Sequence, residues 1–432
     1  MLRSATNADM AQSVAHFIGS EEVPGSIPGV STRLKPFGRK GLSLIYLCGN
    51  KNMKKIIIIP DSFKGSLTSE QVASIISEEI DKVSDGKVEI VKLPIADGGE
   101  GSTDCIINSL GGEKIKAIVK SPENKDIDAY YGIIKKGDRK TAVIEIAESS
   151  GITKQTSYNA KDATTYGFGQ LIKNALDNGC SDFLLCLGGS ATTDCGLGMA
   201  AALGVKFMDN SGCCFVPTGG TLNRVTTIDI SGIDSRIDKA SFTVMCDVDN
   251  PLYGKRGAAY VYGPQKGADA EDVILMDLGL KNVSGVLCKL KCQDLSDHPG
   301  AGAAGGAGYG CMTFLNAKMK SGIESMLEIV EFDNKVKDCD LIVTGEGRVD
   351  EQSFMGKVLS GITAHSLGKK VTAFCGCLGL SEYENTDIEY IKSYKNIDII
   401  EVGYGIDVEE SIKNAGVYLR KAAKAYFEYY IK

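Results

Sequence analysis

Apolar runs alternate with polar, glycine-rich segments along the chain from residue 53 onward, and this alternation predicts an α/β fold. The four isoleucines at 56–59 indicate a buried strand, which ends at Pro60. A helix is predicted after it, because apolar residues recur at helical spacing at Val72, Ile75, Ile76 and Ile80. Thr68-Ser69-Glu70-Gln71 has the spacing of a capping box, so the helix is expected to begin there.

The same rhythm of strand and helix continues toward the C-terminus. Further strands are predicted at Val88–Leu93, Phe183–Leu187, Phe242–Cys246, Leu341–Thr344, Val371–Cys375 and Ile397–Val402, and helices at Thr164–Asn178 and Ala317–Ile329. Three short strands with charged turns interrupt this rhythm, and they favour a small antiparallel meander at Lys114–Val119, Ala129–Ile134 and Thr141–Ile146. The interruption predicts that a second domain begins near residue 115.

Five of the predicted strands run directly into polar or glycine-rich segments. These segments are PDSFKGS, ADGGEG, GGSATTD, DVDN and GEGRVD. In open parallel α/β sheets, ligands bind outside the carboxyl ends of the strands, so side chains of this kind belong there. A structural protein does not need acids at five strand ends. The pattern therefore predicts a ligand site at the edge where these strands end.

The first 52 residues lack this pattern. They mix Ser, Gly, Pro and scattered charges without periodicity, and no signal-peptide layout precedes the apolar run Leu42–Cys48. We expect residues 1–52 to be either a disordered leader or the result of a wrongly assigned translation start, with the functional protein beginning at Met53.

Composition narrows the range of partners and compartments. A net charge of −7 and a pI near 5.3 leave no basic face for phosphate backbones, which argues against nucleic acid but allows small anions. No apolar run approaches the ~20 residues of a membrane-spanning helix, so no membrane partner is expected. The fourteen cysteines form no CxxC pair, which is typical of a reducing compartment and predicts a cytoplasmic protein.

The strand-end segments carry the groups that phosphoryl transfer requires. Two or three carboxylates can hold Mg²⁺ together with substrate phosphates, and a lysine can neutralise a transferring phosphoryl group. Glycines let the backbone approach an anion and donate N–H bonds. The segments supply all three kinds of group: Asp61, Asp97, Glu100, Asp194, Asp247, Asp249, Glu346, Asp350, Lys64, Lys357, Arg348, Gly98-Gly99 and Gly188-Gly189.

Two other functions stay open at this point. The stretch from Gly300 to Gly305 matches GxGxxG, which would suit an NAD-dependent oxidoreductase of a small hydroxy acid, but His298-Pro299 precedes it where that motif needs a strand. A non-catalytic ligand-binding protein on the same fold would be expected to have lost the strand-end acids. GxxxxGK[ST] does not occur, so the chain is not a P-loop enzyme.

Taken together, the segments resemble the bacterial glycerate kinase family, the type I enzymes that phosphorylate D-glycerate with ATP. The matching pieces lie in the family's order: PDSFKGSLTS, LPIADGGEGS, GGSATTDCGLGMAAALG, CDVDNPLYG, YGPQKGA, PGAGAAGGAGYG and LIVTGEGRVDEQS. They cover the chain from Met53 to nearly its end. Thr193 and Cys195 stand where many members carry Asn and Gly, on either side of an intact Asp194.

The resemblance implies a two-domain α/β fold with the active site in the cleft between the domains. A flavodoxin-like parallel-sheet domain would comprise residues 53–115 and 320–432, with a smaller mixed α/β domain inserted at 116–319. It also implies conversion of ATP and D-glycerate to ADP and phosphoglycerate, usually the 2-phosphate, by a monomer or homodimer that uses Mg²⁺.

The expected site residues come from the strand-end segments. Lys64 is predicted to neutralise charge on the transferring phosphoryl group or the glycerate carboxylate, and Asp194 to act as general base. Substrate contacts are expected at Asp61, Ser62, Gly65, Asp97, Gly98, Gly99, Glu100 and Ser190. ATP contacts are expected at Gly188, Gly189, Thr192, Asp247, Asn250, Gly345 and Glu346. Asp61, Asp97 and Glu346 are alternatives for Mg²⁺ or for the acid's hydroxyls, with Mg²⁺ assigned to Asp97 and Glu346.

Overall fold

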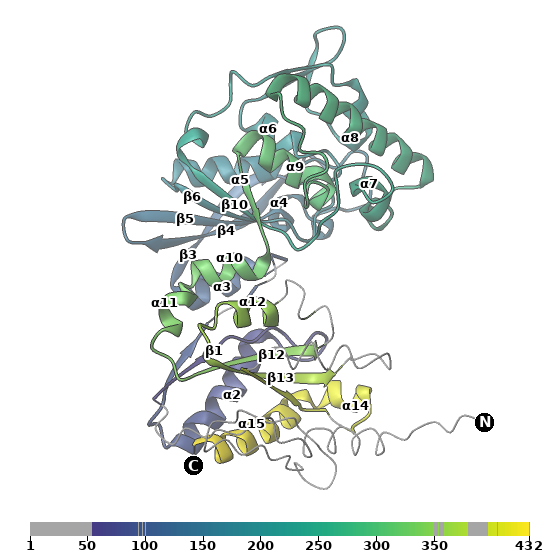
Figure 1. Cartoon of the computed structure of the whole chain (residues 1–432). Helices are drawn as coiled ribbons and strands as arrows, with labels where there is room; N and C mark the ends of the chain where they lie inside the picture. Colours follow the sequence, from purple (N-terminus) through teal and green to yellow (C-terminus); the bar gives the residue numbers. More distant parts are fainter. Residues whose placement is uncertain are drawn as a thin grey trace, which may run out of the picture. The chain divides into compact units, whose positions relative to one another are not determined.

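The computed structural model divides the chain into two compact units (Figure 1). It describes residues 54–93, 95–96, 98–99, 101–349, 353, 358–378, 396–403 and 405–431. Asp97, Glu100 and the predicted leader lie outside these residues. The first unit combines Met1–Ile95 with Met326–Lys432, and the second is Ala96–Ser325. The second unit is the longer of the two, and so is not the smaller insertion that was expected.

The first unit contains a five-stranded sheet in which every strand pair is parallel. Its order is β14-β13-β12-β1-β2. Numbered within this unit alone, the order is 2-1-3-4-5, which is the flavodoxin-like order predicted above. The strands are β1 (Lys55–Ile58), β2 (Glu89–Lys92), β12 (Leu341–Val349), β13 (Lys370–Leu378) and β14 (Ile397–Glu401).

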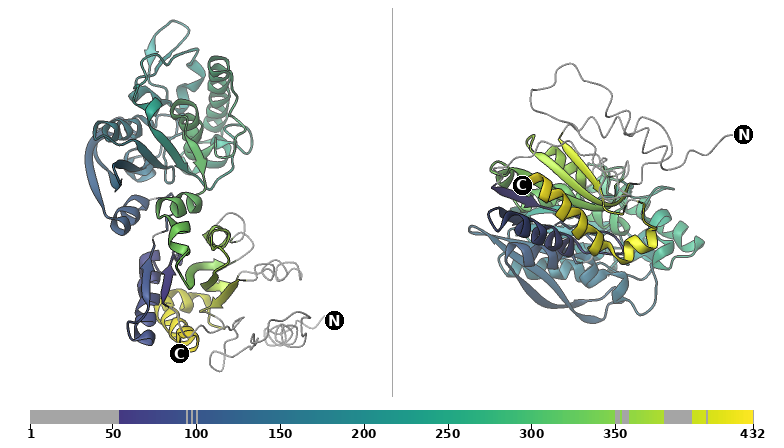
Figure 2. Two further views of the ribbon diagram at one scale, coloured as in Figure 1. Left: turned by 60° about the vertical axis from the view of Figure 1, so that its left-hand side comes forward. Right: turned by 90° about the horizontal axis from the view of Figure 1, so that it is seen from below.

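Helices cover this sheet so that its central strands are buried. The isoleucines 56–59 are all inaccessible to solvent, as a central parallel strand requires. Ile56 and Ile58 pack in one core cluster with apolar residues of α2 (Ser69–Ser84) and α15 (Ala415–Ile431). These two helices lie side by side (Figure 2). The other helices that the structure describes in this unit are α11 (Phe332–Val336), α12 (Val358–Ala364) and α14 (Val408–Lys413), and α10 (Gly322–Ile329) spans the division between the units.

The predicted capping box is present at the start of α2. The Gln71 N–H donates to Thr68 Oγ1 (3.2 Å), and the Thr68 N–H donates to Gln71 Oε1 (2.9 Å). Two N–H groups that the helix leaves unpaired are thereby satisfied. The cap fixes where the loop after β1 ends.

Replacing Thr68 by alanine is expected to lower the free energy of unfolding by about 1 kcal/mol, because one of these N–H groups loses its acceptor. Urea unfolding followed by circular dichroism measures the change. Ser69→Ala is the matched control, since the Ser69 hydroxyl makes no hydrogen bond within the described part of the chain. An equal effect of the two substitutions would contradict the cap's contribution.

The second unit is built on a six-stranded mixed sheet of order β11-β10-β6-β5-β4-β3. The strands from β11 to β5 are parallel to one another, and β4 and β3 are antiparallel additions at one edge. The predicted antiparallel meander is confirmed as β3-β4-β5, and it forms one edge of this sheet because β5 also pairs with β6. The strands are β3 (Gly112–Lys120), β4 (Asp126–Lys136), β5 (Arg139–Glu145), β6 (Asp182–Cys186), β10 (Ser241–Met245) and β11 (Lys318–Lys320).

Helices and a small second sheet complete this unit. The small sheet has the order β8-β7-β9. Its strands are β7 (Lys206–Met208), β8 (Cys214–Phe215) and β9 (Thr227–Asp229). The helices are α3 (Ser102–Leu110), α4 (Ile146–Ser150), α5 (Tyr166–Asp177), α6 (Leu197–Ala202), α7 (Ala258–Tyr262), α8 (Ala270–Lys291) and α9 (Ala303–Leu315), with 3₁₀ turns at η2 (Ile152–Lys154), η3 (Gly219–Arg224), η4 (Ile237–Lys239) and η5 (Pro264–Lys266).

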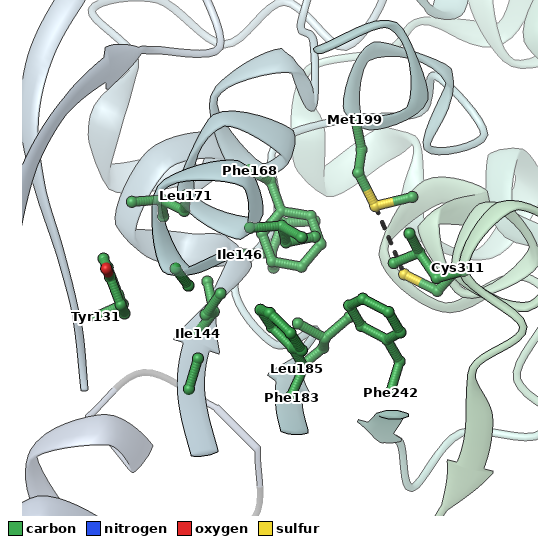
Figure 3. Packing of buried hydrophobic residues seen from close by; sticks show 14 of the residues in the cluster. Tyr131, Ile144, Ile146, Phe168, Leu171, Phe183, Leu185, Met199, Phe242 and Cys311 are labelled. Atoms are coloured by element: carbon green, nitrogen blue, oxygen red, sulfur yellow. Dashed lines mark hydrogen bonds between the residues drawn. The ribbon is translucent and has the colours of Figure 1, made fainter. Parts of the chain in front are cut away.

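Aliphatic side chains fill most of the core between the large sheet and its helices, together with aromatic and sulfur-containing ones (Figure 3). Phe183 of β6 and Phe242 of β10 stack with ring centroids 4.5 Å apart. The Sγ of Cys311 in α9 lies 3.8 Å from the Sδ of Met199 in α6. This packing fixes the end of β6, where the glycine-rich segment GGSATTD begins.

Three predicted boundaries differ from the structure. The helix predicted at Ala317–Ile329 is the strand β11 followed by α10, because Lys318–Lys320 pair with β10. The strand predicted at Leu341–Thr344 continues to Val349. The units divide after residues 95 and 325, whereas the sequence placed these divisions after 115 and 319; α3 and the start of β3 account for most of the difference.

Candidate functional site

The loop after β1 lies at the point where the strand order of the first sheet reverses. Such a switch point is where open α/β sheets bind ligands. The Asp61 N–H donates to the Gly345 carbonyl of β12 (2.8 Å), which ties the start of the loop to the neighbouring strand. The Phe63 side chain is buried, whereas Ser62 and Lys64 are exposed. The loop is therefore anchored at both ends and presents polar side chains outward.

Glycines in β12 make room for this loop. A Cβ on Gly347 would lie 3.0 Å from the Lys64 backbone nitrogen, and one on Gly345 would lie 3.2 Å from the Phe63 ring. Gly345 and Glu346 were expected in a loop after the strand, but they lie inside β12, paired with Phe374 and Cys375. Their position beside the β1 loop does not depend on that correction. This unit thus brings Asp61, Ser62, Lys64 and Gly65 together with Gly345 and Glu346.

Lys64 has a free side chain at this position. Lys64 is exposed, and its ammonium forms no hydrogen bond or ion pair within the described part of the chain. Gly65 takes a left-handed backbone (φ 83°), which turns the chain immediately after it. An exposed cation on an anchored loop is suited to an anionic ligand.

In the second unit, two predicted glycine pairs lie against each other. The Gly188 N–H donates to the Gly98 carbonyl (3.1 Å), and a Cβ on Gly188 would lie 2.6 Å from Gly99 Cα. Gly189 takes a left-handed backbone (φ 74°) and is exposed. The backbone of Gly98 and Gly99 therefore lies next to the end of β6, as expected for two segments of one site.

Asp194 is placed differently from the expectation of a general base. Its side chain is inaccessible to solvent. Its Oδ2 accepts from the Thr165 N–H (2.7 Å), the Thr165 hydroxyl (2.8 Å) and the Gly198 N–H (3.2 Å), and its Oδ1 accepts from the Gly196 N–H (3.0 Å). Burial raises the pKa of Asp194, although these donors oppose the rise. The carboxylate joins the start of α5 to the loop before α6, and this geometry favours a positioning role.

The structure adds Lys266, which was not among the predicted site residues. Its side chain is buried with 2% exposure. Its Nζ donates to the Thr192 carbonyl (2.7 Å) and lies 3.0 Å from Ser190 Oγ. Burial lowers the pKa of Lys266 to about 7, and the negative charge of Asp194 acts in the opposite direction. The segment YGPQKGA was part of the resemblance, but nothing along the sequence places its lysine beside GGSATTD.

Glu145 is a second residue that the sequence reasoning missed. It ends β5, is 3% exposed, and accepts from the N–H groups of Gly101 (3.0 Å) and Thr103 (2.6 Å) at the start of α3. Burial raises the pKa of Glu145. The available signal was an acid inside the apolar run AVIEIA. Its carboxylate holds the segment that follows Gly98 and Gly99.

Asp247 and Asn250, which were predicted to contact ATP, serve local hydrogen bonds. Asp247 Oδ1 accepts from the Gly322 N–H at the start of α10 (2.8 Å). Asn250 Nδ2 donates to the Arg256 carbonyl (2.8 Å), and its Oδ1 accepts from the Tyr262 hydroxyl (2.6 Å). Asn250 is thus held in place by its neighbours, while Asp247 remains exposed at the end of β10.

The GxGxxG match does not have the geometry of a dinucleotide-binding turn. Residues 296–299 form a turn before Gly300, where that motif requires a strand. Ala304, Gly305 and Gly306 all take left-handed backbone conformations. A Cβ on Gly305 would lie 1.9 Å from the Thr192 carbonyl oxygen, so these glycines allow α9 to pack against the GGSATTD segment.

Comparison with known proteins agrees with this arrangement. The model of the glycerate kinase family matches residues 56–430. The chain belongs to the glycerate kinase family. It is therefore an enzyme, a phosphotransferase that acts on an alcohol group.

Individual glycerate kinases are similar along most of their length. A glycerate kinase of Bacillus subtilis is 38% identical over 374 residues, covering 86% of this chain and 96% of the relative. A glycerate 2-kinase of Escherichia coli is 40% identical over 328 residues, covering 75% and 86%. The crystal structure of a protein assigned as glycerate kinase 2 from Salmonella typhimurium LT2 superposes with a TM-score of 0.74 at 33% identity, covering 87% of this chain and 98% of that one.

The described residues also lack two further features. Within them, no three His, Cys, Asp or Glu side chains gather as a metal-binding group. No helix in the described ranges is long and apolar enough to cross a membrane.

Proposed function

We propose that this glycerate kinase transfers the γ-phosphoryl group of ATP to D-glycerate, with the 2-hydroxyl as acceptor. The observation that carries the proposal is the β1 loop, which presents the exposed Lys64 at the switch point of a flavodoxin-like sheet. Phosphoryl transfer is catalysed mainly by positioning and by charge stabilisation, and this loop supplies both.

Lys64 is the residue that neutralises the transferring phosphoryl group or the glycerate carboxylate. Asp61, Ser62 and Gly65 line the same loop and contact the substrate. The charge of the lysine is available because no protein group within the described residues pairs with it. A cation aimed at developing negative charge contributes directly to the rate.

Asp61 and Glu346 fit a Mg²⁺ ion that accompanies ATP. Mg²⁺ takes oxygen ligands and is commonly held by one or two carboxylates together with substrate phosphates and waters. Both acids lie toward the carboxyl ends of the central strands β1 and β12. There the Asp61 N–H donates a hydrogen bond to the carbonyl of Gly345, the residue before Glu346. Asp97 remains a further predicted ligand. The bound ion supplies charge neutralisation to the phosphates.

In the second unit, the segment around Gly98-Gly99 and the segment that follows β6 bind anionic oxygens. Gly98, Gly99, Gly188, Gly189, Ser190 and Thr192 supply backbone N–H groups and hydroxyls, with Glu100 as a further predicted contact. Asp247 of this unit remains a predicted nucleotide contact, as does Gly345 of the first unit. Asp194 holds the Thr165 and Gly196–Gly198 backbone in place. A role as general base is the alternative, and the Asp194→Asn variant distinguishes the two roles.

We further propose a cytoplasmic enzyme that acts as a monomer or homodimer. All the described cysteines are free thiols, as expected in a reducing compartment.

The test is release of ADP, measured by a coupled assay with ATP, Mg²⁺ and D-glycerate. We expect turnover that depends on D-glycerate, and NMR of the product is expected to show phosphate on the 2-hydroxyl. Parallel reactions without glycerate, and with NAD in place of ATP, serve as controls. Absence of ADP release with D-glycerate would overturn the proposed function, and a 3-phosphate product would overturn the choice of hydroxyl alone.

A further inference from the structure

The ammonium of Lys266 lies inside the second unit, on the inner side of the segment that follows β6. We propose that Lys266 is a positioning residue that turns the Ser190 hydroxyl into a hydrogen-bond donor toward an anionic oxygen of a bound substrate. The inference rests on the proposed function, and it concerns how the Ser190 contact is formed.

The direction of the Lys266–Ser190 hydrogen bond follows from donor chemistry. An ammonium has three donors and no acceptor, so Ser190 Oγ must accept from Lys266 Nζ across their 3.0 Å separation. The hydroxyl proton of Ser190 is then left to donate elsewhere. Lys266 is the one side-chain partner of Ser190 within the described part of the chain. The hydroxyl therefore has a donor to offer to a ligand.

The backbone around Ser190 is held firmly, so the hydroxyl has a fixed position. The Ile152 N–H donates to the Gly189 carbonyl (2.9 Å), and the Ala191 N–H donates to the Ser150 carbonyl (2.9 Å). Two residues on, the Thr192 carbonyl accepts from Lys266 at 2.7 Å. Lys266 thus holds the backbone of the segment at Thr192 and orients the hydroxyl of Ser190.

Neighbouring hydroxyls point independently to a polar ligand. The Oγ1 atoms of Thr192 and Thr193 are buried and have no hydrogen-bond partner among the described residues. A buried polar group without a partner costs free energy, so such groups are few in folded proteins. Thr192 and Thr193 follow Ser190 on the same segment, and two such hydroxyls are what a segment built around a polar ligand would contain.

Charge explains why a lysine is tolerated at this depth. Within the described ranges, the negative charge of Asp194, which is buried on the same segment, opposes the lowering of the Lys266 pKa. The adjacent Cys195 thiol is neutral, because burial raises its pKa. Burial disfavours the charged amine, so the ammonium is complete only below its lowered pKa. Above that pKa the neutral amine can accept the Ser190 proton, and the hydroxyl then no longer donates to the ligand.

The experiment measures ligand affinity in the intact enzyme by calorimetry. One arm uses D-glycerate alone, and the other uses a non-hydrolysable ATP analogue with Mg²⁺, because a carboxylate and a phosphate offer the same acceptor chemistry. Ser190→Ala, Lys266→Met and the double variant are compared with the wild type. We expect each single substitution to weaken one of the two ligands by about ten- to a hundredfold. The double variant should lose no more than the larger single loss, because both act through one hydrogen bond.

A pH series separates positioning from a merely structural role. In the wild type, affinity for that ligand is expected to fall as pH rises through the lowered pKa of Lys266, and Ser190→Ala should remove this dependence. Lys116→Met, at an exposed lysine on β3 paired with Asp128, is the matched control and should bind as the wild type does. If Lys266→Met fails to fold, Ser190→Ala and the wild-type pH series still decide.

Unchanged affinity for both ligands in Ser190→Ala, or losses that add in the double variant, would overturn the inference. Failure of the wild type to bind either ligand would instead count against the proposed function. The two failures are therefore distinguishable.

Discussion

Replacing Lys64 by alanine is expected to lower kcat for D-glycerate phosphorylation by about 10²- to 10³-fold, the range seen when one charge-stabilising group is removed from a reacting centre. The side chain is exposed and has no partner within the described residues, so the substitution removes no contact that holds the fold. The melting temperature should therefore stay at the wild-type value while turnover falls.

Steady-state kinetics with saturating ATP and D-glycerate measure this loss. Lys87→Ala is the matched control in the same unit. Its exposed ammonium lies 3.7 Å from an equally exposed Asp85. Lys87 precedes β2 at the amino end of the parallel β1–β2 pair, whereas the β1 loop follows the carboxyl end. This variant should retain wild-type kcat. A loss below about tenfold for Lys64→Ala would remove Lys64 from the transferring group, since it would fall short of the range for such groups.

Replacing Asp194 by asparagine is expected to lower the free energy of unfolding by about 3 kcal/mol, because a buried, fully bonded carboxylate loses its match to its donors. The two oxygens accept from backbone N–H groups of Thr165, Gly196 and Gly198. An amide would direct an NH₂ group at some of these N–H groups and leave them unpaired. Thermal and chemical unfolding measure the change, with the exposed Asp128→Asn as control.

The same variant separates the two roles of Asp194. A positioning carboxylate predicts a large loss of stability, and a kcat loss smaller than that of Lys64→Ala when both are measured well below the melting temperature. A general base predicts instead a kcat loss at least as large as that of Lys64→Ala, whatever the change in stability. Unaltered stability would contradict the positioning role.

The sequence predicted those parts of the fold that depend on local pattern. The isoleucine run became a buried central strand, and the Thr68 cap formed with both of its hydrogen bonds. The PDSFKGS segment was correctly placed after a strand because apolar periodicity and turn chemistry are both local properties. The family resemblance then gave the strand order of the first unit.

Burial and pairing between distant residues were beyond such patterns. In the sequence, Asp194 is one more acid after a predicted strand. Only the fold shows that its carboxylate accepts a hydrogen bond from Thr165, 29 positions earlier. Lys266 is 76 positions from Ser190, so their contact has no local signal. The extent of β12 was misjudged because glycines normally end strands, whereas Gly345 and Gly347 here allow the close approach of the β1 loop.

The pairing of β1 with β12 has a consequence for how the chain folds. These central strands pair residues that are far apart in the sequence, and a hydrogen bond just before them, from the Lys54 N–H to Asp340 Oδ2, joins residues 286 positions apart. Contacts of such long sequence separation form slowly, because a large loop must close before they contribute. During translation, Ala96–Ser325 is synthesised before β12, so this unit can begin to fold before β1 has its β12 partner. Because the central strands of this sheet pair last, we expect a slow final phase of refolding and dependence on chaperones during synthesis.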